Sequence, residues 1–106
     1  MDPRTQIRRA QAKMFKALGH PSRLLMLDAL RSGAKCVCDL HALVGNDMST
    51  VSKHLAVLRE AGLVETEKCG TNIYYRLSLC CLDSFLKCSE DAIRQRISSQ
   101  LGMLDA

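Results

Sequence analysis

The chain has 106 residues, 47% of them hydrophobic and 25% charged, which is the balance of a single soluble globular domain spanning residues 1–106. Its longest unbroken run of Leu, Ile, Met and Val is Leu24–Leu27, far short of the roughly 20 apolar residues that cross a membrane. The N-terminus carries basic residues with no apolar segment behind them. This argues against a secretory signal and predicts a cytoplasmic protein.

A net charge of +4 permits nucleic-acid binding without requiring it. The chain contains only two Phe, two Tyr and no Trp, so its core is modest and oligomerisation is expected. Six residues are cysteines: Cys36, Cys38, Cys69, Cys80, Cys81 and Cys88. In a reducing cytoplasm such thiols serve as metal ligands or redox groups more often than as structural disulfides.

Apolar residues at steps of three and four predict a helix near the N-terminus. These residues are Ile7, Ala10, Met14, Ala17 and Leu18. The segment Gly19–Ser22 interrupts the pattern, because Gly suits a helix end and Pro suits the next start. A second helix is predicted from about Ser22 to Arg31.

Two further helices are predicted in the middle of the chain. A short one runs from about Cys38 to Val44 and ends at Gly45. The next has Asp47 as its N-cap and continues to about Ala61. Two helices joined by such a brief turn have the form of a helix-turn-helix.

The periodicity then changes from helix to strand. Leu63–Glu67 and Asn72–Leu77 are rich in β-branched and aromatic residues, and Lys68–Thr71 between them reads as a tight turn, so a β-hairpin is predicted. A last helix is predicted over about Leu82 to Leu101, with a long apolar seam. The expected fold is therefore mainly α with one small hairpin, in the order α-α-α-α-β-β-α.

A helix-turn-helix followed directly by a hairpin is a winged helix, which places its second helix in a DNA major groove. The polar positions near the start of that helix are expected to be exposed and suit base edges and phosphates, and they are Ser49, Thr50, Ser52, Lys53 and His54. Lys68 and Thr71 at the hairpin tip, with Arg76 on the returning strand, can reach phosphates or a minor groove.

Four segments together resemble one family. Phe15–Leu24 is similar to F-K-x-L-x-x-x-x-R-L, Cys36–Leu40 to C-V-C-D-L, Ser52–Val64 to S-x-H-L-x-x-L-R-x-x-G-L-V, and Gly70 with Tyr74–Leu77 to a wing ending in Y-R-L. This is the pattern of the ArsR/SmtB family of metal-sensing winged-helix repressors. The resemblance implies a homodimer joined through its first and last helices. It implies binding to an inverted-repeat operator, and release when a toxic metal or metalloid binds.

Thiolates select soft or borderline ions, and three sulfurs suit As(III) or Sb(III). Cys36 and Cys38 are two residues apart, so in a regular helix they point roughly 200° apart. They can share an ion only if Cys36 lies just outside the helix. The third cysteine of the arsenite-sensor box is replaced here by His41, which suits a divalent metal better than As(III).

Cys80, Cys81 and Cys88 resemble the C-terminal cysteine sites of some arsenic-responsive members. They form a second site, or one of them completes the Cys36/Cys38 site within one subunit or across the dimer. The expected inducer is As(III) or Sb(III), alternatively Cd, Pb or Zn, and no organic cofactor is expected.

Three other interpretations stay open at this level. The same cysteines can form a disulfide or persulfide, which makes a thiol-redox repressor. A winged helix can also bind protein instead of DNA. A thiol enzyme is disfavoured, because the chain has no Cys-x-x-Cys beside a βαβ unit, no Gly-rich phosphate loop and no paired nucleophile and base.

Overall fold

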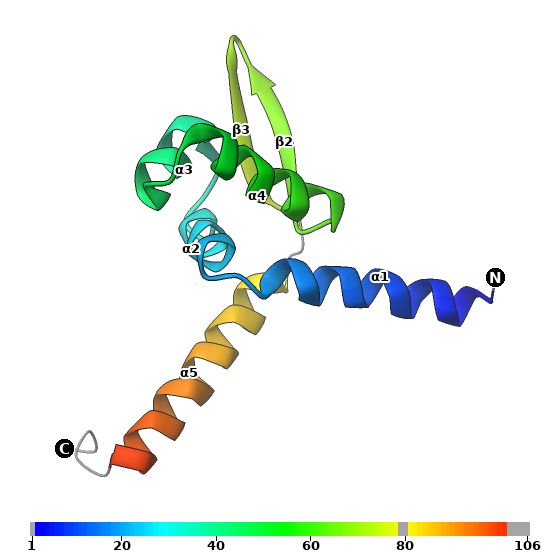
Figure 1. The fold of residues 1–106 in the computed structure, drawn as a ribbon, viewed down its shortest axis with the longest axis vertical. Helices are drawn as coiled ribbons and strands as arrows, with labels where there is room; N and C mark the ends of the chain where they lie inside the picture. Colours follow the sequence, from blue (N-terminus) through cyan, green and yellow to red (C-terminus); the bar gives the residue numbers. More distant parts are fainter. Residues whose placement is uncertain (1, 79–80, 102–106) are drawn as a thin grey trace.

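The computed structural model describes residues 2–78 and 81–101, which form helices around a small sheet (Figure 1). In chain order the elements are α1 (Pro3–Leu18), α2 (Pro21–Leu30), β1 (Lys35–Cys36), α3 (Val37–Val44), α4 (Met48–Glu60), β2 (Val64–Cys69), β3 (Asn72–Leu77) and α5 (Leu82–Leu101). The mainly α fold with a hairpin is confirmed. The expected order needs one correction, because a short strand precedes the third helix.

Side-chain acceptors set the starts of two central helices. α2 follows His20, whose Nδ1 accepts the backbone N–H of Ser22 at 3.0 Å. α4 follows Asp47, whose carboxylate accepts the backbone N–H of Thr50 at 3.3 Å. Each acceptor satisfies an N–H that has no partner inside the helix. The predicted cap at Asp47 is therefore confirmed, and α2 begins at Pro21, one residue earlier than expected.

The hairpin strands β2 and β3 pair antiparallel along their whole length. Their loop is Gly70–Thr71, shorter than the expected turn because Lys68 and Cys69 pair with β3. Gly70 has a φ of +65°, in the left-handed region where a side chain is disfavoured. Two-residue hairpin loops use such angles, so this glycine allows the strands to extend to the tip.

The sequence did not predict β1. Lys35 pairs with Tyr75 and Cys36 with Tyr74, which gives a three-stranded antiparallel sheet in the order β1-β3-β2. Two residues are too few to show the alternation by which a strand is recognised. The strand matters because it ties the start of α3 to the hairpin.

The core lies where α2, α3 and α4 meet the base of the sheet. Its buried residues are Ala17, Met26, Leu27, Leu30, Leu40, Val51, Leu55, Leu58, Leu63, Val64 and Leu82. Among the described residues, α1 contributes only Ala17 to this set and α5 only Leu82. The two terminal helices are thus anchored to the body at one end each.

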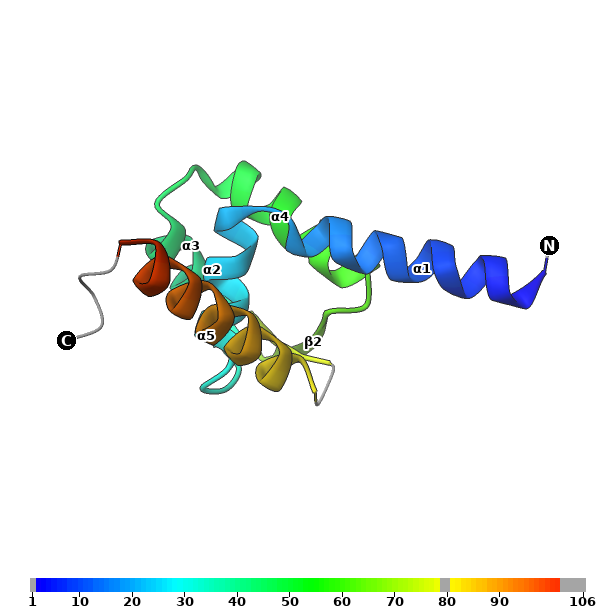
Figure 2. The same ribbon diagram turned by 90° about the horizontal axis from the view of Figure 1, so that it is seen from below.

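Beyond these anchors α1 and α5 project from the body in different directions (Figures 1 and 2). The radius of gyration is 16.1 Å, whereas a compact chain of this length has about 13 Å. The projecting helices leave apolar side chains uncovered: Ile7 (61% exposed), Phe15 (60%), Phe85 (47%), Ile93 (57%), Ile97 (43%) and Leu101 (56%). None of the described helices has the length and apolar character to span a membrane.

Candidate DNA interface and thiol sites

The helix-turn-helix is formed by α3 and α4. A short turn joins them, in which Gly45 has a φ of +79°, a left-handed angle that ends α3. The apolar stripe of α4, which is Val51, Leu55 and Leu58, is buried in the core. Because one face of α4 is buried, the opposite face is free to meet a partner.

That free face carries part of the predicted contact set. Ser49, Ser52 and Lys53 are exposed, whereas Thr50 is half-buried. The hydroxyl of Ser49 donates to Asp47 at 2.9 Å. Hydrogen bonds from Thr50 first, and then from Ser49, hold the pKa of the Asp47 carboxyl below its ordinary value. The Ser49 hydroxyl is therefore oriented by the cap, and its lone pairs remain open to a donor.

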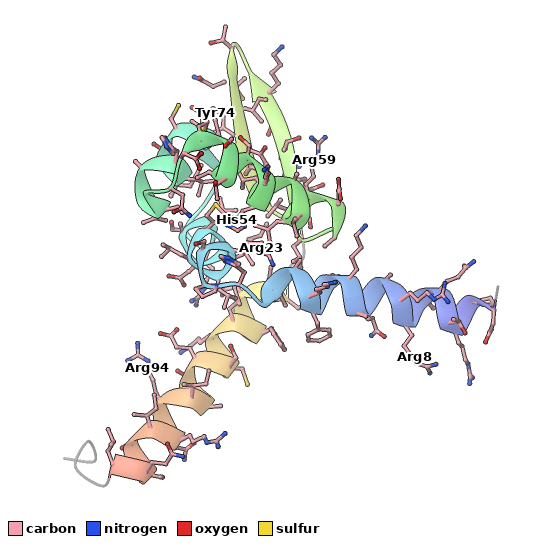
Figure 3. All side chains as sticks on the ribbon, viewed as in Figure 1. Arg8, Arg23, His54, Arg59, Tyr74 and Arg94 are labelled. Atoms are coloured by element: carbon pink, nitrogen blue, oxygen red, sulfur yellow. The ribbon has the colours of Figure 1, made fainter. Side chains whose placement is uncertain are left out.

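The expectation that His54 is an exposed position on this face was wrong. His54 is half-buried, and its ring lies 4.4 Å from the ring of His20, measured between centroids. Nη1 of Arg23 lies 3.3 Å from Nδ1 of His54, and Figure 3 shows the two side chains converging. Arginine can only donate, so Nδ1 of a neutral His54 is the acceptor and its proton is on Nε2.

Arg23 also closes the end of α1. Its side chain donates to the backbone carbonyl of Ala17 at 2.7 Å and to that of Lys16 at 3.4 Å. One guanidinium group thus joins the last turn of α1 to His54 on α4. Sequence reasoning placed Arg23 in a family motif without giving it a role, because its partners lie on two other helices, α1 and α4.

The hairpin tip presents the two predicted residues to solvent. Both are exposed, Lys68 near the end of β2 and Thr71 in the loop itself. Arg76 is engaged elsewhere, since it donates to Glu65 at 3.3 Å and to Glu67 at 3.0 Å across the strand pair. Its charge is therefore largely offset within the hairpin.

Cys36 and Cys38 lie at the start of α3 as the predicted ion-sharing geometry requires. Cys36 is the N-cap, outside the helix, with extended backbone angles, and its Sγ accepts the backbone N–H of Asp39 at 3.4 Å. Cys38 is exposed in the first turn. Since Cys36 also pairs with Tyr74 in β3, this thiol lies where α3, β1 and the hairpin meet.

The remaining cysteines are distributed over other elements. Cys81 lines an apolar pocket between α1 and α5, Cys88 is exposed on α5, and Cys69 is exposed at the hairpin tip. Cys80 lies outside the described residues. Across residues 2–78 and 81–101, no three His, Cys, Asp or Glu side chains gather closely enough to hold a metal ion. Within this part of one chain, Cys81 and Cys88 are therefore not assembled with Cys36 and Cys38.

The environment of His54 predicts an acid-sensitive fold. Burial foremost, and then the positive charges of His20 and Arg23, lower the pKa of His54 from 6.5. The unfolded chain therefore binds a proton that the folded chain resists, so the contribution of His54 to stability is fully present above about pH 6.5 and is lost as the pH falls below it. The slope attributable to His54 is at most about 1.4 kcal/mol per pH unit, the value for one proton.

Thermal unfolding between about pH 5 and about pH 8 measures this effect. His54→Gln should flatten the dependence, because the side chain that resists protonation is then gone. Equal slopes in the wild type and His54→Gln would contradict the assignment.

Comparison with known proteins agrees with this architecture. The family described as "Bacterial regulatory protein, arsR family" matches residues 20–66. The SmtB transcriptional repressor homolog of Synechocystis is 43% identical over 67 residues, which are 63% of this chain and 51% of that protein. The arsenical resistance operon repressor of Escherichia coli is 42% identical over 69 residues, 62% of this chain and 57% of that protein. The chain thus spans little more than half the length of these two relatives.

Solved structures extend the likeness to nearly the whole chain. The homodimeric winged helix-turn-helix DNA-binding domain Mb0332 of Mycobacterium bovis superposes with a TM-score of 0.84 at 26% identity, covering 93% of this chain and 92% of that one. The transcriptional repressor BigR of Xylella fastidiosa gives a TM-score of 0.68 at 33% identity, covering 83% and 92%. The winged helix-turn-helix fold is therefore confirmed, and the chain belongs to the arsR family of bacterial regulatory proteins.

Proposed function

We propose that this chain is a transcriptional repressor that binds operator DNA as a homodimer and leaves it when a thiophilic ion binds its cysteines. The observation that carries the proposal is the position of Cys36, which caps α3 of the helix-turn-helix and pairs with β3 of the hairpin. The proteins with which the chain shares fold and sequence are described as regulators, not enzymes.

On DNA, α4 lies in the major groove. Ser49 and Ser52 face base edges, and Lys53 contacts a phosphate. The hairpin reaches the neighbouring backbone or minor groove through Lys68 and Thr71. Thr50 and His54, which are half-buried, support the position of α4 more than they contact DNA directly.

A second copy of the chain covers the uncovered faces of α1 and α5. Ile93, Ile97 and Leu101 form an apolar seam along α5 that is exposed in a single chain. Burying such side chains against a partner is favourable at about 25 cal/mol per Å². The similar Mb0332 domain is described as homodimeric. Two-fold symmetry places two recognition helices about 34–36 Å apart, in successive major grooves of an inverted repeat.

Sensing begins at the Cys36/Cys38 pair. Cys38 belongs to the first turn of α3 and Cys36 precedes it, so an ion bound to both sulfurs bends or unwinds this turn. α3 packs on α4 through the core residue Leu40, and β1 is bonded to β3. A change at Cys36 therefore reaches both the recognition helix and the hairpin, and favours the form that fits DNA poorly.

The inducer we favour is As(III) or Sb(III), which three sulfurs suit. The third sulfur comes from Cys80, Cys81 or Cys88, of the same subunit or its partner. Support for an arsenic compound comes from the likeness to the arsenical resistance operon repressor. With His41 as a ligand the site suits Cd, Pb or Zn instead.

A second candidate function keeps the DNA binding and replaces the ion by oxidation. All five described cysteines are free thiols, and four of them are exposed. A similar structure, HlyU of Vibrio cholerae, is described in a reduced form, with a TM-score of 0.71 at 26% identity and coverage of 83% of this chain and 93% of that one. Disulfide or persulfide formation at these thiols is the alternative signal.

Fluorescence anisotropy on a duplex from the upstream region of the gene tests the function. The phosphine-reduced protein should bind tightly, and arsenite near the protein concentration should release it. Dithiol reductants must be avoided because they chelate As(III). No binding to the duplex would contradict the repressor. Release by peroxide or by Cd, Pb or Zn, with no effect of arsenite, would contradict the favoured inducer.

The role of the α3 thiols is tested by Cys36→Ser combined with Cys38→Ser. A serine hydroxyl can still cap α3, so DNA affinity should stay within about threefold of the wild type. Induction should need at least about tenfold more arsenite, because the ion loses two sulfurs. Cys69→Ser, at the exposed hairpin tip, is the matched control and should induce normally. Normal induction of the double variant would refute the assignment.

Assembly is tested by Ile93→Glu combined with Ile97→Glu. Placing two carboxylates in the α5 seam should convert the dimer to monomer in sedimentation velocity, because buried unpaired charges are costly. Ile73→Glu, equally apolar and 44% exposed on β3, should leave the dimer intact. A dimer that persists in the double variant would show that another surface joins the subunits.

A further inference from the structure

The positive charge of the chain is concentrated in α1, outside both the helix-turn-helix and the hairpin. α1 contains five of the fifteen Lys and Arg residues and none of the eleven Asp and Glu residues. The other ninety residues hold ten basic and eleven acidic side chains. The five cations of α1 are Arg4, Arg8, Arg9, Lys13 and Lys16. The entire excess of positive charge therefore belongs to this helix.

The module proposed to dock on DNA has no such excess. The segment Val37–Leu77 holds four basic and five acidic residues, and Arg76 is already bound to Glu65 and Glu67. Binding to the phosphate backbone depends on Lys and Arg and supplies most of the sequence-independent affinity. Because the segment Val37–Leu77 has a net negative charge, most of the cations that bind phosphates are expected to come from another part of the molecule.

The cations of α1 are available for this purpose. All five are exposed, and no ion pair in the described part of the chain involves them. α5 is different, since Lys87 pairs with Asp91 at 3.5 Å and Arg94 with Glu90 at 2.8 Å. An ordinary solvated helix carries mixed charges as α5 does, whereas α1 carries one sign only.

Two of these cations lie on the side of α1 that faces α4, and a third shares their face of the helix. Arg9, Lys13 and Lys16 follow one another at steps of four and three, so they share a helix face. Lys13 and Lys16 line a groove with Val57 and Glu60 of α4. Arg8 points to the opposite side of α1, away from α4 (Figure 3).

The recognition helix consequently lies between two flanks. On one side Ser52, Ala56 and Arg59 of α4 line a groove with Tyr75 of the hairpin. On the other side lies the face of Arg9, Lys13 and Lys16, hereafter the cationic face of α1. Glu60 is the acid in that second groove, and the two lysines outnumber it. A duplex that seats α4 in its major groove has a phosphate strand on each side of the groove.

We propose that the cationic face of α1 binds the sugar-phosphate backbone of the same duplex that α4 reads. This inference rests on the proposed DNA-binding function. The face spans about 10 Å from Arg9 to Lys16, which is enough to reach about two neighbouring phosphates of one strand. Phe15 of α1 contacts Phe85 of α5, with ring centroids 6.1 Å apart, so α1 lies on the side of the proposed dimer seam. The phosphates it binds therefore lie between the two half-sites.

Two matched double variants of α1 test the proposal. Lys13→Gln with Lys16→Gln removes two charges from the cationic face, and Arg4→Gln with Arg8→Gln removes two charges from elsewhere on the helix. Glutamine has nearly the same helix propensity as Lys and Arg. Affinity is measured by anisotropy between about 50 and about 200 mM salt, on the upstream duplex and on an unrelated duplex of equal length.

The Lys13/Lys16 variant should lose affinity about tenfold or more on both duplexes, because phosphate contacts carry no sequence information. Its slope of log K against log salt should fall by up to about 3.6 for a dimer that loses four contacts. The Arg4/Arg8 variant should change much less in both respects. Sedimentation velocity and circular dichroism serve as controls and should show that both variants stay folded and dimeric.

Equal losses in the two variants would overturn the proposal, since they would reflect net charge alone. An unchanged salt slope in the Lys13/Lys16 variant with normal operator binding would also overturn it, while leaving the proposed function intact. A wild-type protein that binds neither duplex would overturn both. Should the Lys13/Lys16 variant misassemble, methylphosphonate substitution between the half-sites supplies the test. It should weaken the wild type, and an unchanged wild-type affinity would refute the contact.

Discussion

The antiparallel pairing of Cys36 with Tyr74 is the constraint on which the arrangement of the DNA-facing elements depends. It joins the strand before α3 to the inner strand of the hairpin, so the helix-turn-helix and the wing form one unit instead of two adjacent pieces. The same residue caps α3 through its sulfur. The thiol of Cys36 thus lies where the helix-turn-helix meets the hairpin, the two elements proposed to contact the same duplex. A small movement at this joint changes both at once.

A second link connects that unit to the terminal helices. Arg23 binds the last carbonyls of α1 and reaches His54 on α4, while Phe15 and Phe85 hold the bases of α1 and α5 together. The position of α4 is therefore fixed from one side by the core and from the other by the helices proposed to join two subunits. A change in how the two subunits join would therefore also change the spacing of the two recognition helices. The proposed phosphate contacts and the proposed dimer contacts both involve α1, so DNA binding and assembly depend on the same helix.

Local signals in the sequence were sufficient for most of the fold. Asp47 and Gly45 mark helix ends by capping and by backbone freedom, which depend on neighbouring residues only. β1 escaped prediction because a two-residue strand exists only through its partner. His54 was expected to be exposed because its position near the start of a helix does not reveal that His20, the cap of α2, lies beside it. The thiols at α3 were placed correctly relative to the helix, but which other cysteines join them depends on contacts between distant segments or between subunits, and no local pattern encodes these.

The central claim is that a thiophilic ion at Cys36 and Cys38 disturbs the start of α3 and its pairing with the hairpin together. Hydrogen exchange measured by mass spectrometry, with and without arsenite, tests it most directly. Peptides covering α3 with β1, and those covering β3, should both exchange faster when arsenite is bound, because the capping and pairing hydrogen bonds are weakened. Changes confined to α5, with α3 and β3 as protected as before, would contradict the account.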